Sequence, residues 1–358
     1  MNTEHTVHFA DSRDMSEIED GSVELTVTSP PYPMIEMWDE LFTSLNSEIG
    51  RAIEDGEAYE AFDMMHDELE KVWSEVARVT CEGGVVCVNV GDATRKVDGD
   101  FQLFPNHSKV IDFFTRNGFH LLPGILWRKP TNKASKFMGS GMLPPNAYVT
   151  LEHEHILVFR KEGERRFEPG SQDRYQSAYF WEERNKWFSD VWTDVRGTLQ
   201  DLSNGELRDR AAAYPFEIPY RLINMYSVYG DTVLDPFWGT GTTSLAAMVL
   251  GRNSVGFELE EEFGREFEEQ VEGLEQKTRE VNTARINRHE EFVEDKTQEG
   301  KDWDYEAENY GFPVMTKQEK RILFKSVEEA RRKDKSYVVE YSDFTDDDRI
   351  KEEKQQKL

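Results

Sequence analysis

Strand-like and helix-like segments alternate along the first 130 residues of the chain. Residues 23–29 (VELTVTS) alternate as a strand does, and residues 57–79 place apolar side chains at helical spacing. A glycine turn and an apolar strand follow at 81–92, then a helix at 107–119 and a strand at 121–130. This order predicts an α/β fold with a doubly wound, mostly parallel sheet.

The alternation stops in the middle of the chain and then resumes. Residues 130–213 are irregular, first rich in glycine and proline and then dense in aromatic residues and arginines. Four further elements are predicted after them: a helix at 215–227, a strand at 231–237, a helix at 241–251 and a strand at 253–262. We therefore divide the chain into four parts. Residues 1–129 and 214–280 are the two halves of one α/β domain, residues 130–213 are an inserted region, and residues 281–358 are a charged C-terminal extension. For the extension we expect a solubilising tail or a helical cap on the sheet.

Composition restricts the class of protein. No positively charged apolar leader opens the sequence and no apolar run reaches the length of a membrane span, so we expect a cytoplasmic protein. Two cysteines and eight histidines show no spacing typical of a disulfide framework or a metal site. The 43 basic residues are outnumbered by 71 acidic ones, a net charge of −28 spread along the whole chain. Because molar salt shortens the Debye length to about 3 Å, such a surface indicates a salt-adapted organism.

A glycine turn follows the predicted strand 231–237. Asp235 ends the strand, Gly239 and Gly241 come next, and a helix begins after them. Glycines at this position let a ligand approach the backbone, and the helix N-terminus favours a negative group. Glu258 ends the next strand, where a carboxylate can accept hydrogen bonds from ribose hydroxyls. The turn is neither a Walker loop nor a dinucleotide fingerprint, so it indicates a nucleotide-like cofactor, with a plain structural turn as the alternative.

Three motifs together resemble the S-adenosylmethionine-dependent DNA amino-methyltransferases: TSPPY at 28–32, DPFWGTGTT at 235–243 and VGFE at 255–258. These enzymes carry a [DNS]PP[YFW] loop and methylate an exocyclic base nitrogen. The loop precedes the glycine turn here by about two hundred residues, which is the permuted order of the family's β-group. The resemblance implies a class I methyltransferase (Rossmann-like) fold of permuted order, S-adenosylmethionine as cofactor, and target recognition by the inserted region 130–213.

The proline pair has a chemical reason in such an enzyme. The lone pair of an exocyclic amine is delocalised into the ring, so the nitrogen attacks only when acceptors hold its hydrogens. The resemblance gives this role to Ser29 Oγ and the Pro30 carbonyl, which the stiff backbone of Pro30 and Pro31 presets at little entropic cost. It also makes Tyr32 the ring on which a flipped base stacks.

The resemblance further implies which residues hold the ligands. The cofactor-binding residues would be Asp11, Pro215, Phe216, Asp235, Phe237, Gly239, Gly241, Thr242 and Glu258. Core packing is the alternative for Pro215 and Phe216. The candidate DNA contacts are Lys129, Lys133, Lys136 and Arg174, each with a solvated surface position as its alternative. The acidic surface argues against binding to DNA phosphates. Concentrated salt, however, weakens the contribution of phosphate contacts to DNA affinity for any protein, so contacts with the bases must contribute more.

Serine at the first loop position is associated with cytosine N4 methylation, and aspartate with adenine N6 methylation. Residues 31–39 (PYPMIEMWD) further resemble the N4-cytosine enzymes of salt-adapted archaea that act on CTAG. The resemblance thus implies methylation of cytosine N4 in duplex DNA by base flipping, in restriction-modification or as an orphan methylase. Adenine N6, RNA or a free nucleotide as substrate, and a non-catalytic cofactor- or DNA-binding module stay open. A cognate restriction endonuclease and a homodimer also stay open.

Overall fold

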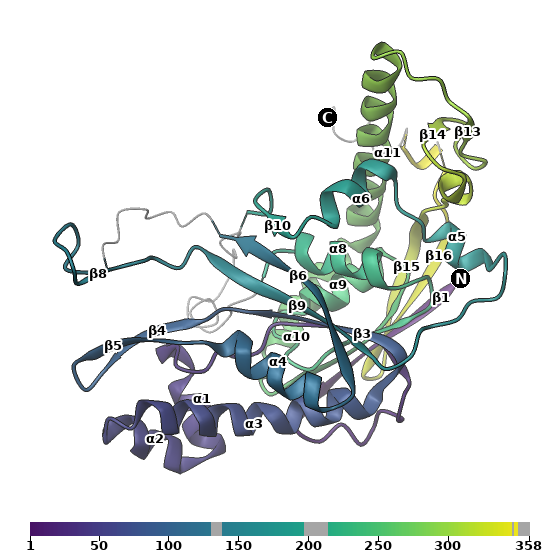
Figure 1. Cartoon of the computed structure of the whole chain (residues 1–358). Coiled ribbons are helices and arrows are strands. Elements are labelled where there is room, and N and C mark those ends of the chain that lie inside the picture. The colour runs from purple at the N-terminus through teal and green to yellow at the C-terminus, as the bar shows by residue number, and fades with distance from the viewer. Residues whose placement is uncertain (130–137, 197–213, 346, 350–358) are drawn as a thin grey trace.

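The computed structural model describes residues 1–129, 138–196, 214–345 and 347–349, and a ten-stranded sheet forms its centre (Figure 1). In spatial order the strands are β10 (Val191–Trp192), β6 (Phe119–Arg128), β9 (His153–Lys161), β3 (Thr80–Val90), β2 (Val23–Thr28), β11 (Thr232–Asp235), β12 (Asn253–Glu258), β1 (Asn2–Phe9), β16 (Ser336–Asp343) and β15 (Lys325–Lys333). The five strands from β3 to β1 are parallel, and β9 runs antiparallel between β3 and β6. The predicted mostly parallel sheet is confirmed.

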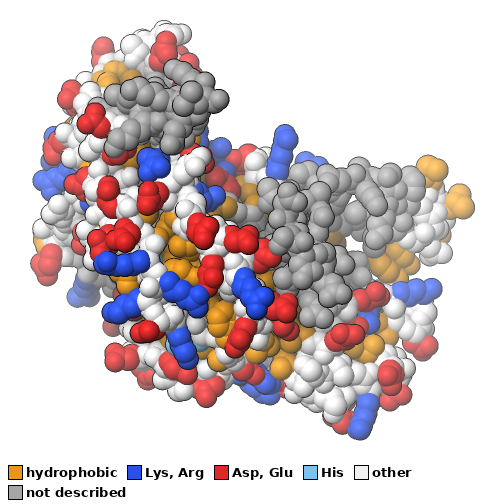
Figure 2. All heavy atoms as spheres, turned by 180° about the vertical axis from the view of Figure 1, so that it is seen from behind, with side chains coloured by type: hydrophobic (Ala, Val, Ile, Leu, Met, Phe, Trp, Pro, Cys, Tyr) orange, Lys and Arg blue, Asp and Glu red, His pale blue; other side chains and the backbone are white. Residues whose placement is uncertain are grey.

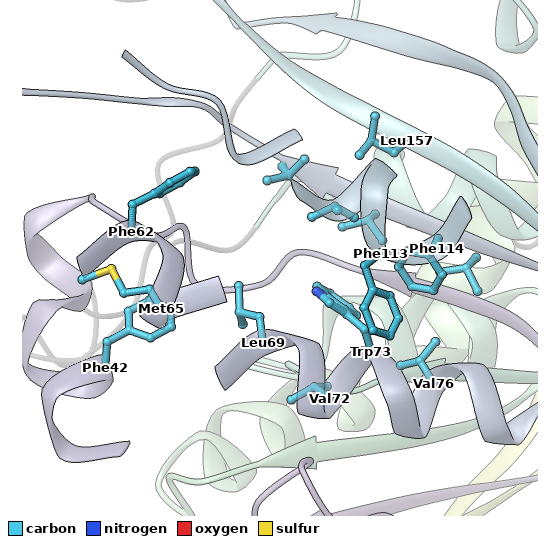
Figure 3. Close-up of a cluster of buried hydrophobic side chains, with 14 of the residues drawn as sticks. Phe42, Phe62, Met65, Leu69, Val72, Trp73, Val76, Phe113, Phe114 and Leu157 are labelled. Atoms are coloured by element: carbon cyan, nitrogen blue, oxygen red, sulfur yellow. The ribbon is translucent and has the colours of Figure 1, made fainter. Parts of the chain in front are cut away.

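Helices cover both faces of this sheet, as a doubly wound fold requires. One face carries α1 (Asp39–Leu45), α2 (Ser47–Glu54), α3 (Ala58–Val79) and α4 (Asn106–Arg116), and the other carries α8 (Glu217–Tyr226) and α9 (Thr242–Val249). Successive strand residues point to opposite faces, so Val86 packs in the first core and Cys87 in the second. Figure 3 shows the first core, where Leu69, Val72, Trp73 and Val76 of α3 meet Phe113 and Phe114 of α4.

The segments outside the two predicted halves contribute to the same sheet. Strands β9 and β10 belong to the predicted inserted region, and the predicted boundary at 280 falls inside α11 (Leu274–Gln298). Near the C-terminus, β15 and β16 form an antiparallel hairpin whose second strand pairs with β1. The extension is therefore folded rather than a tail: it adds strands to the sheet edge, and α11 packs against β15.

The remaining elements are short. They are η1 (Glu36–Trp38), α5 (Gln172–Gln176), α6 (Trp181–Trp187), α10 (Phe263–Glu272), η2 (Lys317–Arg321) and three hairpins, β4 (Ala93–Val97) with β5 (Asp100–Phe104), β7 (Met138–Gly139) with β8 (Ala147–Tyr148), and β13 (Tyr305–Glu306) with β14 (Pro313–Val314). Within the described ranges, no helix combines the length and the apolar character that crossing a membrane requires.

Candidate active site

The two predicted motifs meet because their strands are neighbours. Strand β2 ends at Thr28 and continues into the SPPY loop, and β11 ends at Asp235 and continues into the glycine turn. The two strands are parallel and paired, so both loops leave the same edge of the sheet. Ligands of open α/β sheets bind at this carboxyl edge.

A cavity of about 640 Å³ lies between the loops. The predicted residues that line it are Asp11, Ser29, Pro30, Pro31, Tyr32, Asp235, Phe237, Gly239, Thr242 and Glu258. Pro215, Phe216 and Gly241 are not among the lining residues, whereas Tyr214, which we did not predict, is. The ring of Phe216 instead packs on Tyr220, as the core-packing alternative describes.

The glycine turn is shaped by close packing. Gly241 has φ +78°, and a Cβ there would lie 2.4 Å from the Phe267 ring. The Glu258 carboxylate closes the turn by accepting from the backbone N–H groups of Gly239 at 2.8 Å, Leu259 at 2.8 Å and Glu260 at 3.0 Å. Burial raises the pKa of Glu258, and these hydrogen bonds partly oppose the increase. A carboxylate held rigidly at the cavity, with lone pairs still available, fits the ribose of a nucleoside cofactor.

Asp235 joins the two motifs. It accepts from the Thr28 hydroxyl at 2.7 Å, the Thr243 hydroxyl at 2.6 Å and the Phe237 N–H at 3.1 Å. Burial raises the pKa of Asp235, and the same hydrogen bonds partly oppose the increase. Tyr214 also donates to this carboxylate. All of these partners are protein groups, so a contact between Asp235 and the cofactor stays a prediction.

The SPPY loop is part of a hydrogen-bond network. Ser29 Oγ lies 3.0 Å from the Tyr32 hydroxyl, which donates to Glu154 Oε2 at 3.0 Å. Asn89 Nδ2 donates to the same Glu154 oxygen at 2.7 Å and to the Tyr32 oxygen at 3.0 Å. Lys129 Nζ donates to Glu154 Oε1 at 2.5 Å. Burial and, after it, the charge of Glu154 raise the pKa of Tyr32, so the phenol keeps its proton at neutral pH.

The predicted DNA contacts lie in different places. Lys129 lines the cavity and pairs with Glu154, while Lys133 and Lys136 lie outside the described residues. Arg174 stacks on the Phe167 ring, 5.0 Å from its centroid. Arg165 stacks on the same ring and pairs with Asp231, just before β11 begins. Arg174, on α5 (Figure 1), therefore lies toward the amino end of β11, and the structure does not bring it to the cavity at the carboxyl ends of the strands.

Three potential metal ligands that the sequence spacing did not indicate lie near one another. Atoms of Asp92, His107 and His155 lie within 4.8 Å of each other, and His107 Nδ1 donates to Asp92 at 2.8 Å. The two imidazoles are stacked, with centroids 4.2 Å apart and planes 23° apart. A ring nitrogen directs its lone pair in the ring plane, so two stacked rings do not converge on one ion. The pairing of Asp92 with His107 explains the cluster, and we derive no metal site from it.

Comparisons with known proteins agree with this geometry. The model of the N6/N4 methyltransferase family, described as DNA methylase, matches residues 23–269. The chain is 56% identical over 325 residues to the type II methyltransferase M.MthZI of Methanothermobacter thermautotrophicus, with 90% of each chain covered. It is 52% identical over 301 residues to the type II methyltransferase M.MjaI of Methanocaldococcus jannaschii, covering 80% of this chain and 98% of that one.

Solved structures share the fold. A putative DNA modification methylase of Thermus thermophilus, complexed with S-adenosylmethionine, superposes with a TM-score of 0.59 at 30% identity, covering 75% of this chain and 94% of that one. The PvuII DNA methyltransferase (cytosine-N4-specific) has a TM-score of 0.51 at 16% identity, covering 75% and 86%, and shows the fold alone. The chain therefore belongs to the N6/N4 family of DNA methylases and is a DNA methyltransferase of class I fold that uses S-adenosylmethionine.

Proposed function

We propose that the enzyme methylates the N4 amine of a cytosine flipped out of duplex DNA. The observation that carries the proposal is Ser29 at the first position of the SPPY loop, at the wall of the cavity. Ser29 Oγ and the Pro30 carbonyl accept from the two hydrogens of the amine, and the Tyr32 ring stacks on the base. Serine in place of aspartate here is what favours cytosine over adenine.

The cofactor occupies the part of the cavity next to the glycine turn. Glu258 accepts from the ribose hydroxyls, and the backbone at Gly239 approaches the cofactor closely because no side chain intervenes. Asp11 lines the same cavity and is fixed by a bidentate ion pair from Arg13. Burial raises the pKa of Asp11, but the Arg13 hydrogen bonds outweigh it and lower the pKa overall. We place Asp11 near the adenosine on this basis.

Two hairpins form the proposed DNA face. The β4–β5 and β7–β8 hairpins project from the body on one side (Figure 1), and the rings of Phe101 and Tyr148 stack between them at 4.5 Å. Beyond the stack, Met142, Leu143 and Val149 are 84%, 71% and 85% exposed. Such apolar side chains suit contacts with bases rather than phosphates. This supports a target-recognition role for region 130–213.

The surface charge supports adaptation to concentrated salt. Acidic and basic side chains are interspersed over the face shown in Figure 2, without a broad basic stripe, and the net charge is −28. A protein in molar salt gains little from phosphate contacts, so a recognition face rich in apolar groups suits that setting.

The biological setting follows from the relatives and the motif order. M.MthZI and M.MjaI are type II methyltransferases, which supports a role in restriction-modification, with a cognate restriction endonuclease as the implied partner. The SPPY loop precedes the cofactor loop in the chain, as in the permuted β-group. We propose CTAG as the target from residues 31–39, and the cytoplasm as the compartment.

The nucleoside product tests the proposal. The protein would be incubated in molar salt with unmodified genomic DNA and S-adenosylmethionine, and the DNA digested for mass spectrometry. N4-methylcytosine is the expected product, and N6-methyladenine would refute the proposed base. Absence of any methylated base, with the cofactor still bound, would favour RNA or a non-catalytic module. Two duplexes of equal composition, one with CTAG and one without, then test the target site.

A further inference from the structure

The carboxylate of Glu154 lies next to the SPPY loop and has no role in the proposed function. Glu154 lies on β9, and its side chain is only 11% exposed although it is charged. Burying a charge is costly unless partners compensate it. Lys129 supplies the opposite charge at Oε1, and Tyr32 and Asn89 both donate to Oε2.

The carboxylate fixes the direction of every hydrogen bond that leads to Ser29. An ionised carboxylate only accepts, so the Tyr32 hydroxyl hydrogen points to Glu154. Tyr32 has one such hydrogen, so in the 3.0 Å contact between the two hydroxyls Ser29 is the donor. Asn89 strengthens this order because its amide hydrogens also point at Glu154 and at the Tyr32 oxygen.

The direction of the hydrogen bond from Ser29 to Tyr32 determines whether Ser29 can donate to or accept from a base. The Ser29 hydrogen is directed to Tyr32, and Asn89 Nδ2 donates to Ser29 Oγ over a longer distance of 3.4 Å. A lone pair of Ser29 Oγ is therefore left to accept from the amine. A freely rotating hydroxyl would also populate orientations that donate to the amine nitrogen, which would occupy the lone pair that must attack. A neutral serine thereby becomes a dedicated acceptor.

We propose that Glu154 is a positioning residue that orders the hydrogen bonds Ser29–Tyr32–Glu154 and receives the proton that the amine releases. When bound, S-adenosylmethionine supplies the methyl group: the N–C bond forms while the C–S bond breaks and its electron pair stays on sulfur. The amine nitrogen then carries one proton too many. That proton passes to Ser29 Oγ, the Ser29 hydrogen to Tyr32 and the Tyr32 hydrogen to Glu154 Oε2, from which solvent removes it. This rests on the proposed function in needing an exocyclic amine as the methyl acceptor and Ser29 Oγ as the acceptor of one of its hydrogens.

Three variants test the proposal: Glu154→Gln, Tyr32→Phe and the double variant. Each single variant should slow single-turnover methylation about 10- to 100-fold, which corresponds to the loss of one hydrogen bond to a charged group. Phenylalanine keeps the stacking ring and leaves the pairs of Glu154 with Lys129 and Asn89 intact. If the residues act as one chain, the double variant is no more than about threefold slower than the slower single variant. If the rate loss of the double variant equals the product of the two single-variant losses, the relay is refuted.

Two readouts separate this role from structural damage. Calorimetric binding of S-adenosylmethionine should stay within about twofold of wild type, since the partners of Glu154 are Tyr32, Asn89 and Lys129 and none of the predicted cofactor-binding residues. The pH profile of the single-turnover rate should change shape in Glu154→Gln, because the carboxylate that takes the proton is gone; a profile of unchanged shape would refute the proposal. Tyr32→Phe gives the same test if Glu154→Gln does not fold.

The matched control is Glu152→Gln. Glu152 precedes β9, is 42% exposed and pairs with Arg128 outside the cavity, so its rate and pH profile should match wild type. The identity of the methylated nucleoside separates this inference from the proposed function. A Glu154→Gln enzyme that forms N4-methylcytosine at the wild-type rate would refute the relay and leave the base assignment standing.

Discussion

The Thr28 hydroxyl donates to Asp235 Oδ1 over 2.7 Å, although 207 residues separate the two in the chain. Thr28 is the last residue of β2 and Asp235 the last of β11, so the bond joins the strand that carries the SPPY loop to the strand that carries the glycine turn. Both side chains are buried. This bond therefore adds to the pairing of β2 and β11 in connecting the loop proposed to hold the base with the turn proposed to hold the cofactor.

Thr28→Val should lower the free energy of unfolding by about 1–3 kcal/mol, the usual cost of removing a partner from a buried charged group. The side chain keeps its shape, so the loss reflects the hydrogen bond. Urea unfolding followed by circular dichroism measures it. Thr26→Val is the matched control, because Thr26 lies on the same strand, is fully buried, and has an Oγ1 without a hydrogen-bond partner among the described residues. A loss of equal size in both variants would contradict the role of the Thr28–Asp235 bond.

Ser29→Ala should reduce turnover about 10- to 100-fold and leave cofactor affinity nearly unchanged, because Ser29 serves the amine. Ser44→Ala is the control: Ser44 lines the same cavity, but its hydroxyl donates to the Leu41 carbonyl. Single-turnover rates and calorimetric cofactor binding give the two values. Loss of cofactor binding in Ser29→Ala would show that the assigned role is wrong.

Asp235→Ala should impair more than cofactor binding. From the sequence alone we would expect weaker cofactor affinity with turnover preserved, but Asp235 also holds Thr28 and Thr243. We therefore expect a lower free energy of unfolding, weaker cofactor binding and slower single turnover together. Normal turnover at saturating cofactor would instead favour a direct and separate contact with the cofactor.

The sequence predicted the two motifs and the sheet because both are local patterns. The strand before SPPY and the glycines after Asp235 can be recognised within about ten residues. Glu154 was missed because its partner Tyr32 is 122 residues away and meets it only through the pairing of β9 with β3. Its one local signal is an acidic residue within a strand of buried side chains. The hairpin β15–β16 was missed because β15, at the solvated edge of the sheet, carries mostly charged residues.

Two buried histidines predict that stability falls in acid. Burial lowers the pKa of His5 to about 3 and the pKa of His66 to about 4, against 6.5 in an unfolded chain. Their contribution to the free energy of unfolding is complete above pH 6.5. It is lost as the pH falls toward 4, by up to about 1.4 kcal/mol for each histidine and each pH unit. Urea unfolding at pH 7, 5.5 and 4.5 measures this. His66→Gln, which retains a donor for Asn106 Oδ1, should show a smaller decline, and an equal decline would exclude His66 as a cause.

Added KCl should raise the unfolding temperature, steeply up to about 1 M. With a net charge of −28, acidic groups repel one another in the folded protein, and the Debye length falls from about 10 Å at 0.1 M to about 3 Å at 1 M. Salt also weakens surface ion pairs, but each contributes only about 0–1 kcal/mol, so the relief of repulsion dominates. Sucrose, which stabilises proteins by exclusion from their surface, is the control because it screens no charge. An unfolding temperature that rises with sucrose but not with KCl would contradict salt adaptation. In that case the DNA affinity should be measured again at low salt.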